Sequence, residues 1–348
     1  MAKERKPAKT QRVTIKDVAA AARVSPMTVS NVLNGKHQFV SERTRKIVER
    51  EIDRLNYRIQ QHARSLRVSH RRSVGIVIVD EAASFLSDHF NAHVVAGLSN
   101  VLSRHDHTLT VHGISQSQFS KSVLIRNFAV DGFCVILSGP ETRRAEIVAE
   151  LVRLDQPVVL LQEVVAPPTA DVCIVRQDDA GGGRLIADHL AARRLQSYLI
   201  VTPQQQWPAI EQRVVGFRQA LADAGNSPTV DVIQAAGEDF DAVQVVLAAY
   251  LENHPMPDAI VGTNDRIAIS SMALLKARDV AIPAEVRVTG FNGFESRRYA
   301  SPLLTTVLSP AYDMGAKAAE LMLQRFETGA FPVREVVFPV QLAPGETT

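Results

Sequence analysis

The chain contains 348 residues, of which 46% are hydrophobic and 22% are charged, as in an ordinary globular protein rather than a disordered chain. Its two cysteines are too few to build a disulfide scaffold. Residues 1–12 are basic and polar and lack the apolar stretch of a signal peptide, and no apolar run is long enough to span a membrane. Length and composition therefore predict a cytoplasmic protein of two or three domains with no membrane partner.

Charge is distributed unevenly along the chain. The 39 Lys and Arg residues and the 37 Asp and Glu residues give a net charge of only +2. Residues 1–72, however, hold 18 basic and 6 acidic side chains, a net charge of +12, which leaves −10 for residues 73–348. This asymmetry predicts a nucleic-acid-binding segment joined to a body that does not bind phosphate. A disordered basic tail is the alternative, but an apolar pattern begins after residue 12.

Three short helices are predicted in the basic segment. The first covers about residues 14–22, the second Pro26–Leu33 and the third about residues 41–56. Each is preceded by or begins with a Thr or Ser that can cap the helix, and the second has proline at its first position. Two short helices joined by a tight turn and closed by a third form a helix-turn-helix module.

In this module the second helix enters the major groove of DNA, and its N-terminal part contacts the base edges. The exposed candidates for base contact are Pro26, Met27, Thr28, Ser30 and Asn31. An Asn side chain can form two hydrogen bonds with adenine. Thr28 and Ser30 have an alternative, structural role, because hydroxyl side chains are common in the first turn of a helix, and Ser30 can contact phosphate instead of a base.

From residue 72 onward, short apolar strands alternate with helical segments. This alternation predicts parallel βαβ units in doubly wound sheets, and the segment is too long for one such sheet, so we expect two lobes. Both cysteines lie in apolar runs that are typical of buried strands. Ligands of open α/β sheets bind beyond the carboxyl ends of the strands. The expected strands include residues 74–79, 109–112, 132–137, 158–161, 199–201, 259–261 and 287–290.

An enzyme interpretation finds no catalytic motif. The sequence contains no G-x-G-x-x-G, Walker, H-E-x-x-H or G-x-S-x-G motif, and its ten histidines show no metal-ligand spacing. Gly181-Gly182-Gly183 opens a helix and could bind phosphate, but no Lys-Ser/Thr follows it, so close packing of the helix on the sheet is the favoured interpretation. The sequence therefore predicts neither catalysis nor a cofactor.

Several segments of the basic region match one known headpiece. They are T-I-K-D-V-A at 14–19, V-S-P-M-T-V-S-N-V-L-N-G at 24–35, V-S-E-R-T-R at 40–45, L-N-Y-R at 55–58 and A-R-S-L-R at 63–67. This ordered set resembles the headpiece of the lactose/galactose-repressor family. The DNA-contacting positions that the resemblance implies are Thr14, Ser25, Pro26, Met27, Thr28, Ser30, Asn31, Asn34, His37, Ala63, Arg64, Leu66 and Arg67.

The resemblance also implies a hinge helix over about residues 60–66 that folds only on operator DNA. In it Leu66 inserts between base pairs from the minor groove and kinks the duplex. Ile59-Gln60 stands where the family usually has Pro-Asn, which weakens the helix cap. Arg23 stands where Gly or Asn is usual, and a positive φ there costs an Arg about 1 kcal/mol. Asn31 replaces the usual Arg, which implies an operator that departs from the common family sequence.

The same family resemblance extends over the body. The matching segments are D-D-A-G-G at 178–182, R-V-V-G-F at 213–217, T-N-D-R-I-A at 263–268, V-T-G-F-N at 288–292 and P-L-L-T-T-V at 302–307. The family fold is similar to that of periplasmic sugar-binding proteins, with two Rossmann-like lobes joined by three crossovers. The fold class that it implies is a small all-α headpiece followed by this two-lobed α/β body.

The predicted domains follow from charge, pattern and resemblance. They are a disordered basic tail at 1–12, a helix-turn-helix domain at 13–58, a hinge helix and linker at 59–72, and an effector-binding and dimerisation domain at 73–348. The first lobe is expected at about 73–175 and 311–331, and the second at about 176–308 and 332–348.

The resemblance implies a set of effector-binding residues in the body. Arg213 would bond ligand hydroxyls or a carboxylate, although pairing with a nearby acid is the alternative, and Phe240 would stack on a sugar unless it lies in the core. Gln162 and Asn292 stand where the family commonly has Asp, so we expect reduced repulsion of an anion and favour an acidic sugar derivative near the gluconate-type branch; a neutral sugar is the second choice. The full set is Phe90, Gln162, Arg213, Phe240, Asn264, Asp265 and Asn292.

The resulting function is that of a ligand-responsive transcriptional regulator. It is expected to repress sugar or sugar-acid catabolism genes by binding a pseudo-palindromic operator as a homodimer, and to be released by a small effector. The alternatives are a corepressor-dependent regulator of the same family and a solute-binding protein without DNA function. A solute-binding protein needs a signal peptide and has no use for residues 13–67. The C-terminus lacks leucine heptads, so we do not expect a coiled-coil tetramer.

Overall fold

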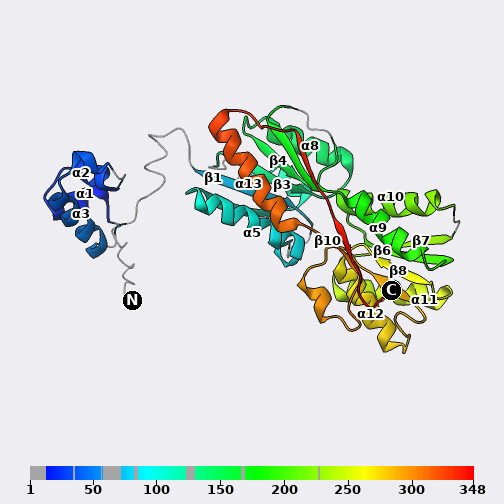
Figure 1. Cartoon of the computed structure of the whole chain (residues 1–348). Coiled ribbons are helices and arrows are strands. Elements are labelled where there is room, and N and C mark those ends of the chain that lie inside the picture. The colour runs from blue at the N-terminus through cyan, green and yellow to red at the C-terminus, as the bar shows by residue number, and fades with distance from the viewer. Residues whose placement is uncertain are drawn as a thin grey trace, which may run out of the picture. The chain divides into compact units, whose positions relative to one another are not determined.

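The computed structural model divides the chain into two compact units, Met1–Arg71 and Arg72–Thr348. The structure describes residues 13–33, 36–55, 57, 72–81, 85–122, 130–165, 169–225 and 228–348. The expected hinge helix, with Leu66, lies outside these residues. We describe the units, shown in Figure 1, separately.

The first unit contains the helix-turn-helix module. Its helices are α1 (Ile15–Ala22), α2 (Pro26–Leu33) and α3 (Glu42–Arg54), with a 3₁₀ turn η1 (His37–Phe39) before α3. A small apolar core joins the three helices. It consists of the buried side chains Val18, Ala19, Ala22, Val29, Val32 and Val48, with partly buried apolar residues around them.

Local sequence explains the ends of these helices. Thr14 and Asp17 form a capping box at the start of α1, and Ser41 accepts a hydrogen bond of 3.2 Å from the Thr44 amide at the start of α3. Arg23 ends α1 in the left-handed conformation, with φ 53°. The positive φ expected at Arg23 is therefore confirmed, and the capped ends fix the tight turn that orients α2.

The second unit is built on two parallel sheets, as the strand–helix alternation predicts. We call the first lobe the six-stranded sheet, of order β11-β5-β4-β3-β1-β2, with its helices. Its strands are β1 (Ser73–Val79), β2 (Thr108–Ile114), β3 (Gly132–Leu137), β4 (Val158–Leu161), β5 (Val172–Gln177) and β11 (Glu335–Phe338). Its helices are η2 (Phe85–Ser87), α5 (His89–Arg104), α6 (Gln116–Phe119), α8 (Glu141–Val152) and α13 (Ala311–Thr328).

The second lobe contains a four-stranded parallel sheet, of order β7-β6-β8-β9, and an antiparallel pair. The sheet strands are β6 (Ser197–Pro203), β7 (Thr229–Ala235), β8 (Ala259–Gly262) and β9 (Arg287–Thr289), and the pair is β10 (Thr306–Leu308) and β12 (Gln341–Ala343). The helices are α9 (Asp179–Ala191), α10 (Pro208–Asp223), α11 (Phe240–Asn253), α12 (Asp265–Ala277) and η3 (Glu295–Tyr299).

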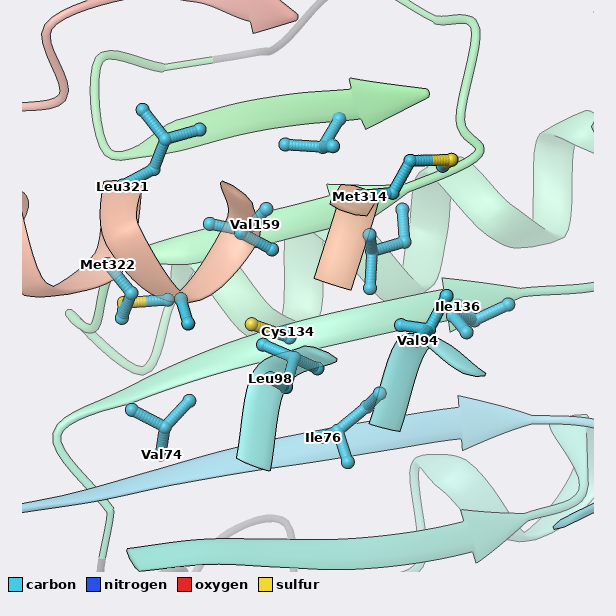
Figure 2. Packing of buried hydrophobic residues seen from close by; sticks show 14 of the residues in the cluster. Val74, Ile76, Val94, Leu98, Cys134, Ile136, Val159, Met314, Leu321 and Met322 are labelled. Atoms are coloured by element: carbon cyan, nitrogen blue, oxygen red, sulfur yellow. The ribbon is translucent and has the colours of Figure 1, made fainter. Parts of the chain in front are cut away.

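Both faces of each sheet are covered by helices, so the strands are apolar on both sides. In the first lobe α5 and α13 lie side by side on one face, and Figure 2 shows Leu98 and Met322 from these helices beside Cys134 of β3. The other face packs Ile147 and Leu151 of α8. Cys134 and Cys173 are buried free thiols in β3 and β5, as their apolar surroundings predict.

The C-terminal segment departs from the expected division of the lobes. Residues 332–348 were expected in the second lobe, but β11 pairs in parallel with β5 in the first-lobe sheet. The residues after β11 belong to the second lobe, where β12 pairs with β10 and Thr347 is hydrogen-bonded to Val288 and Thr305. The physical reason is that β5 still has an open edge after β4 has paired with it, and Val336 and Phe338 of β11 pack against the first-lobe core.

Three crossovers connect the lobes, after β5, after β10 and after β11; the last is the red segment of Figure 1. They are hydrogen-bonded to one another. Ser309 Oγ donates to Gln177 Oε1 at 2.6 Å, and the Asp178 amide donates to the Phe338 carbonyl at 2.9 Å. The three crossovers are therefore connected by direct hydrogen bonds. Within the described part of the chain, no helix is both long and apolar enough to cross a bilayer.

Candidate functional site

The side chains of α2 that are predicted to contact bases are exposed or half-buried. Pro26 and Met27 are exposed, the latter to 64%, whereas Thr28, Ser30 and Asn31 are half-buried. Val29 and Val32 on the opposite side are buried in the core, so the orientation of α2 follows from its apolar residues. The geometry leaves one side of α2 available to a DNA groove.

Hydroxyl groups at the start of this helix bond each other. Ser25 Oγ accepts a hydrogen bond of 3.1 Å from the Thr28 amide and lies 2.9 Å from Thr28 Oγ1. These two side chains therefore have a capping role within the headpiece, which was the structural alternative for Thr28. Thr14 likewise caps α1, and His37 begins η1. Asn34, Ala63, Arg64, Leu66 and Arg67 lie outside the described residues.

A cavity of about 410 Å³ lies between the two lobes of the body. It is lined from the carboxyl ends of strands of both sheets, where open α/β folds place their ligands. Among its lining residues are five of the predicted effector-binding side chains: Phe90, Gln162, Arg213, Asn264 and Asn292. The fold thus brings together residues that are up to 202 positions apart in the sequence.

Two predicted effector residues do not line the cavity. Phe240 begins α11 with 53% of its surface exposed, so it lies neither in the core nor among the lining residues of the cavity. The buried residues of α11 are Val243 and Leu247, and Phe240 precedes them by one turn at the exposed first position of the helix. Asp265 is buried behind the cavity wall.

The aromatic lining comes from other residues. Trp207 and Phe85 line the cavity together with Phe90. Trp207 is the single tryptophan of the chain and directly precedes Pro208, the first residue of α10. A lone tryptophan before a helix start at the end of β6 was the signal that could have identified it.

Arg213 is held in one position by three hydrogen bonds. Its Nε donates to Asp179 Oδ1 at 2.8 Å, its Nη1 to the Thr263 carbonyl at 2.7 Å and its Nη2 to Asn292 Oδ1 at 3.3 Å. Its guanidinium also stacks on the Phe291 ring, 3.8 Å from the centroid. Arg213 therefore pairs with a nearby acid, Asp179, which was the alternative to a role in ligand binding. It lines the cavity as a buried group whose charge is compensated by that acid.

Asp179, which the sequence did not single out, organises the buried polar groups behind the cavity. Besides Arg213 it accepts hydrogen bonds from Gln177 Nε2 at 2.8 Å and Gln162 Nε2 at 3.1 Å. Burial raises the pKa of Asp179, and the Arg213 guanidinium and the two amide donors act in the opposite direction. Gln177 also accepts a hydrogen bond from Ser309 of the second crossover. A continuous set of hydrogen bonds therefore runs from the cavity wall through Asp179 and Gln177 to the crossovers between the lobes.

Close packing of α9 and α10 positions the Asp179–Arg213 pair. A Cβ on Gly183 would lie 2.0 Å from the Arg213 carbonyl oxygen, and a Cβ on Gly216 would lie 1.9 Å from the Ala180 carbonyl oxygen. Only glycine permits this helix–helix approach. The run at 181–183 therefore serves packing, as favoured over a phosphate site, although Gly183 packs on a helix rather than on the sheet.

Asn264 and Asp265 fix the start of α12 beside the cavity. Asn264 Oδ1 accepts a hydrogen bond of 2.9 Å from the Ile267 amide and caps the helix. Asp265 accepts from Thr306 Oγ1 at 2.6 Å and from the Gly293 amide at 2.7 Å. Burial raises the pKa of Asp265 to about 7, although these donors favour the charged form. Asp265 thus anchors α12 to the strand that leads into the second crossover.

One side chain of the second lobe spans the cavity to the first lobe. Gln205 Nε2 donates to Asp80 Oδ1 at 3.0 Å and to Ser138 Oγ at 2.7 Å, and the Gly139 amide donates to the Gln206 carbonyl at 2.7 Å. These hydrogen bonds join the ends of β1 and β3 to the loop after β6. They hold the lobes together at one edge of the cavity.

The cavity lining is strongly acidic. Among the described residues it contains two arginines, Arg213 and Arg266, and five carboxylates, namely Asp80, Glu81, Asp88, Glu238 and Asp239. Burial and the neighbouring carboxylates of Asp88 and Asp80 raise the pKa of Glu238 to about 7, against the influence of the two arginines. Sequence reasoning pointed to Asp80 at the end of an expected strand but did not identify Asp88, Glu238 and Asp239 as lining residues, because these belong to loops of two separate lobes.

Comparisons with known proteins identify both units. Residues 14–60 match the model of bacterial regulatory proteins of the lacI family, and residues 187–348 match a periplasmic binding protein-like domain. The chain is 29% identical over 317 residues to the HTH-type transcriptional repressor PurR of Vibrio atlanticus (strain LGP32), covering 90% of this chain and 92% of the relative. It is 28% identical over 339 residues to the ribose operon repressor of Halalkalibacterium halodurans, covering 96% and 97%.

Solved structures show the same arrangement. A complex of the transcriptional regulator CelR with cellobiose is similar with a TM-score of 0.70 and 25% identity, over 97% of this chain and all of that chain. The Lac repressor bound to ONPG gives a TM-score of 0.83 at 21% identity, over 97% and 100% of the two chains. The relatives are transcriptional repressors rather than enzymes. The chain is therefore similar to bacterial regulatory proteins of the lacI family in its DNA-binding unit and to a periplasmic binding protein-like domain in its body, and the relatives that it matches over most of its length are transcriptional repressors.

Proposed function

We propose that this repressor binds a pseudo-palindromic operator as a homodimer and that a small polyhydroxylated ligand in the interlobe cavity controls its affinity for that operator. The observation that carries the proposal is the cavity itself, because its wall is hydrogen-bonded through Asp179 and Gln177 to the crossovers between lobes. A ligand that competes for the donors of Arg213 changes this network. Family resemblance supplies the link from the lobes to the DNA-binding unit.

On the DNA side, we propose that α2 reads the major groove and that Leu66 inserts into the minor groove. One headpiece carries a single recognition helix, so a palindromic site requires two copies. The Lac repressor in a solved structure is a dimer bound to operator, which supports the same assembly here. We assign Asn31 to contact with adenine, and the Lys and Arg residues of the headpiece to contacts with phosphate groups.

The ligand proposed here differs in charge from the acidic sugar that the sequence favoured. That expectation came from the amides Gln162 and Asn292 beside Arg213. In the folded chain Asp179 already neutralises Arg213, and the surrounding carboxylates repel an anion. A ligand with hydroxyl groups and no carboxylate fits this lining better. Related regulators have been solved with cellobiose and with ribose, which supports a polyhydroxylated ligand.

The DNA part is tested by a gel-shift titration with a palindromic operator at two salt concentrations. We expect affinity to fall steeply with salt, because Lys and Arg contacts to phosphate release counterions. Leu66→Ala and Asn31→Ala should weaken specific binding much more than binding to random DNA. Equal losses on both DNAs would contradict the assignment of these residues, and the absence of salt-dependent binding would contradict the DNA-binding function.

The assembly and the direction of control need separate measurements. Sedimentation equilibrium should give a dimer, and a monomer at operator-binding concentrations would contradict the proposed assembly. Ligand should release the operator in the gel shift; tighter binding would identify the corepressed alternative. Trp207→Ala should weaken ligand binding about tenfold or more, since aromatic side chains provide much of the contact area in such sites, whereas Phe240→Ala should leave it within about twofold.

A further inference from the structure

The distribution of charge around the interlobe cavity restricts the chemistry of the ligand further. Three carboxylates approach it from two directions: Asp80 follows β1, Asp88 caps α5, and Glu238 precedes α11 in the second lobe. Glu238 interacts electrostatically with both aspartates. Carboxylates of the two lobes therefore repel one another across the space that the ligand occupies.

The arginines of the cavity do not balance this negative charge. Arg213 forms a buried ion pair of 2.8 Å with Asp179, which lies behind the wall, so its charge is already compensated. Arg266 is the second arginine of the described lining and interacts electrostatically with Glu238. One arginine cannot compensate the charges of all the carboxylates in the lining. The empty cavity therefore holds an excess of negative charge in a confined space, where such charge is expensive to maintain.

The remaining lining separates into two kinds of surface. Trp207, Phe85 and Phe90 offer aromatic faces. The amide side chain of Asn292 is hydrogen-bonded to Arg213, and that of Gln162 to Asp179, the partner of Arg213; such amides can donate to and accept from hydroxyl groups. With about 410 Å³ the cavity is far larger than one hydrated ion and suits an organic molecule of sugar size.

We propose that the ligand is an amine-bearing polyol, an amino sugar or a molecule of that chemistry, whose protonated amine lies among Asp80, Asp88 and Glu238 while its hydroxyl groups face Gln162, Asn292 and Arg213. This inference rests on the proposed function and specifies the ligand class of the same cavity. The ammonium group relieves the repulsion between the lobes, so binding favours the arrangement in which the lobes approach each other. Selectivity then comes from charge, because a neutral sugar leaves the repulsion in place and a sugar acid increases it.

The test uses sets of sugars that differ at one group. Glucose, glucosamine and glucuronic acid form one set, and galactose, galactosamine and galacturonic acid form a second. Each is titrated against the full-length protein by thermal shift and calorimetry at pH 7.5. We expect the amine of at least one set to bind ten times or more tighter than its neutral counterpart, and the acid to bind most weakly. Tighter binding of a neutral or acidic member, or no binding by any amine, would overturn the proposal.

Variants test the contribution of the carboxylates. Glu238→Gln should reduce the affinity for the amine about tenfold and leave the affinity for the neutral sugar within about twofold. Asp80→Asn provides a second variant should Glu238→Gln fold poorly. Glu252→Gln, at the exposed far end of α11, is the matched control and should change neither affinity. Equal effects of Glu238→Gln and Glu252→Gln on amine binding would overturn the proposal.

Operator binding separates this inference from the function on which it rests. In the absence of ligand, the wild type and Glu252→Gln should bind operator with equal affinity, since Glu252 is exposed and is not among the lining residues of the cavity. Loss of operator binding by the wild type would contradict the proposed function. Retained operator binding with no preference for the amine would contradict only the ligand class.

Discussion

The two lobes share an architecture but use buried charge differently. Each contains one buried arginine–carboxylate pair: Arg144–Glu163 at 2.9 Å in the first lobe and Arg213–Asp179 at 2.8 Å in the second. Arg144 also bonds the Gly139 carbonyl, and Glu163 accepts from the Val164 amide, so the first pair is satisfied by loops of its own lobe. The second pair lies against the cavity and is hydrogen-bonded toward the crossovers.

The comparison separates a structural pair from a functional one. The first-lobe pair fixes the loops after β3 and β4 and does not line the cavity. In the second lobe, Arg213 contributes its donors to the cavity wall, and Asp179 connects that wall to Gln177. Similar ion pairs with similar burial can therefore serve different purposes, depending on what else their partners contact.

The largest expected effect comes from removing one arginine of either pair. Arg144→Met and Arg213→Met each leave a buried carboxylate without its partner, so the free energy of unfolding should fall by about 3–5 kcal/mol in both variants, as measured by urea denaturation. Only Arg213→Met should also abolish stabilisation by ligand. A small loss for Arg213→Met beside a large loss for Arg144→Met would show that the two pairs are not equivalent in stability.

The complementary change sharpens the same comparison. In the first lobe, Arg144→Met combined with Glu163→Leu removes both charges and should recover most of the lost stability. In the second lobe, Arg213→Met combined with Asp179→Leu should recover stability without recovering ligand binding. Recovery of ligand binding in that double variant would contradict the role of Arg213.

A smaller, pH-dependent effect is expected from Asp265, a second-lobe carboxylate that lacks an arginine partner of this kind. Because the folded chain raises its pKa from 3.8 to about 7, the folded state loses stability relative to the unfolded state as pH rises through this range. Each pKa unit corresponds to about 1.4 kcal/mol. The unfolding free energy of the wild type should therefore fall more than that of Asp265→Asn between pH 4.5 and 8. Parallel curves would contradict the raised pKa.

The glycine contacts between helices should respond alike in the two lobes. A Cβ on Gly97 of α5 would lie 2.1 Å from the Tyr312 carbonyl oxygen, as closely as Gly183 of α9 approaches Arg213. Gly97→Ala and Gly183→Ala should each lower the free energy of unfolding by about 1–3 kcal/mol through overpacking. Ser99→Ala, at an exposed site of α5, is the control. Only Gly183→Ala should also weaken ligand binding, because it displaces α10 and Arg213.

The smallest effect is expected where the lobes meet. Gln205→Ala removes two hydrogen bonds to Asp80 and Ser138 and should lower the unfolding free energy by about 0.5–1.5 kcal/mol. It should also expand the ligand-free body, as measured by small-angle scattering. Gln204→Ala, next to it in the sequence, should change neither quantity as much. Identical scattering of both variants would show that Gln205 does not hold the lobes together.

Local patterns predicted the headpiece and the strand–helix order well, for physical reasons that lie close together in sequence. Thr14, Ser41 and Pro26 mark helix starts by capping and by fixed φ, which depend on neighbours within one turn. The positive φ of Arg23 follows from the tight turn that two short helices require. Parallel strands likewise follow from apolar runs separated by helical segments.

Predictions that depended on distant partners were less successful. The place of β11 in the first lobe depends on the free edge of β5, about 160 residues earlier. Phe240 has a residue type suited to sugar stacking, but it is exposed at the first position of α11, and Trp207 lines the cavity instead. The charge of the cavity could not be inferred from Gln162 and Asn292, because the sequence did not show which acid pairs with Arg213.

The sequence by itself determined that this chain has a basic helix-turn-helix unit and a two-lobed α/β body, because caps, periodicity and charge act over a few residues. Only the tertiary structure decided the charge of the cavity. Asp80, Asp88 and Glu238 belong to loops on two lobes, and their effects add only after folding brings them within electrostatic range. A net charge of +2 for the whole chain thus gives no indication of the acidic cavity between the two lobes of the body.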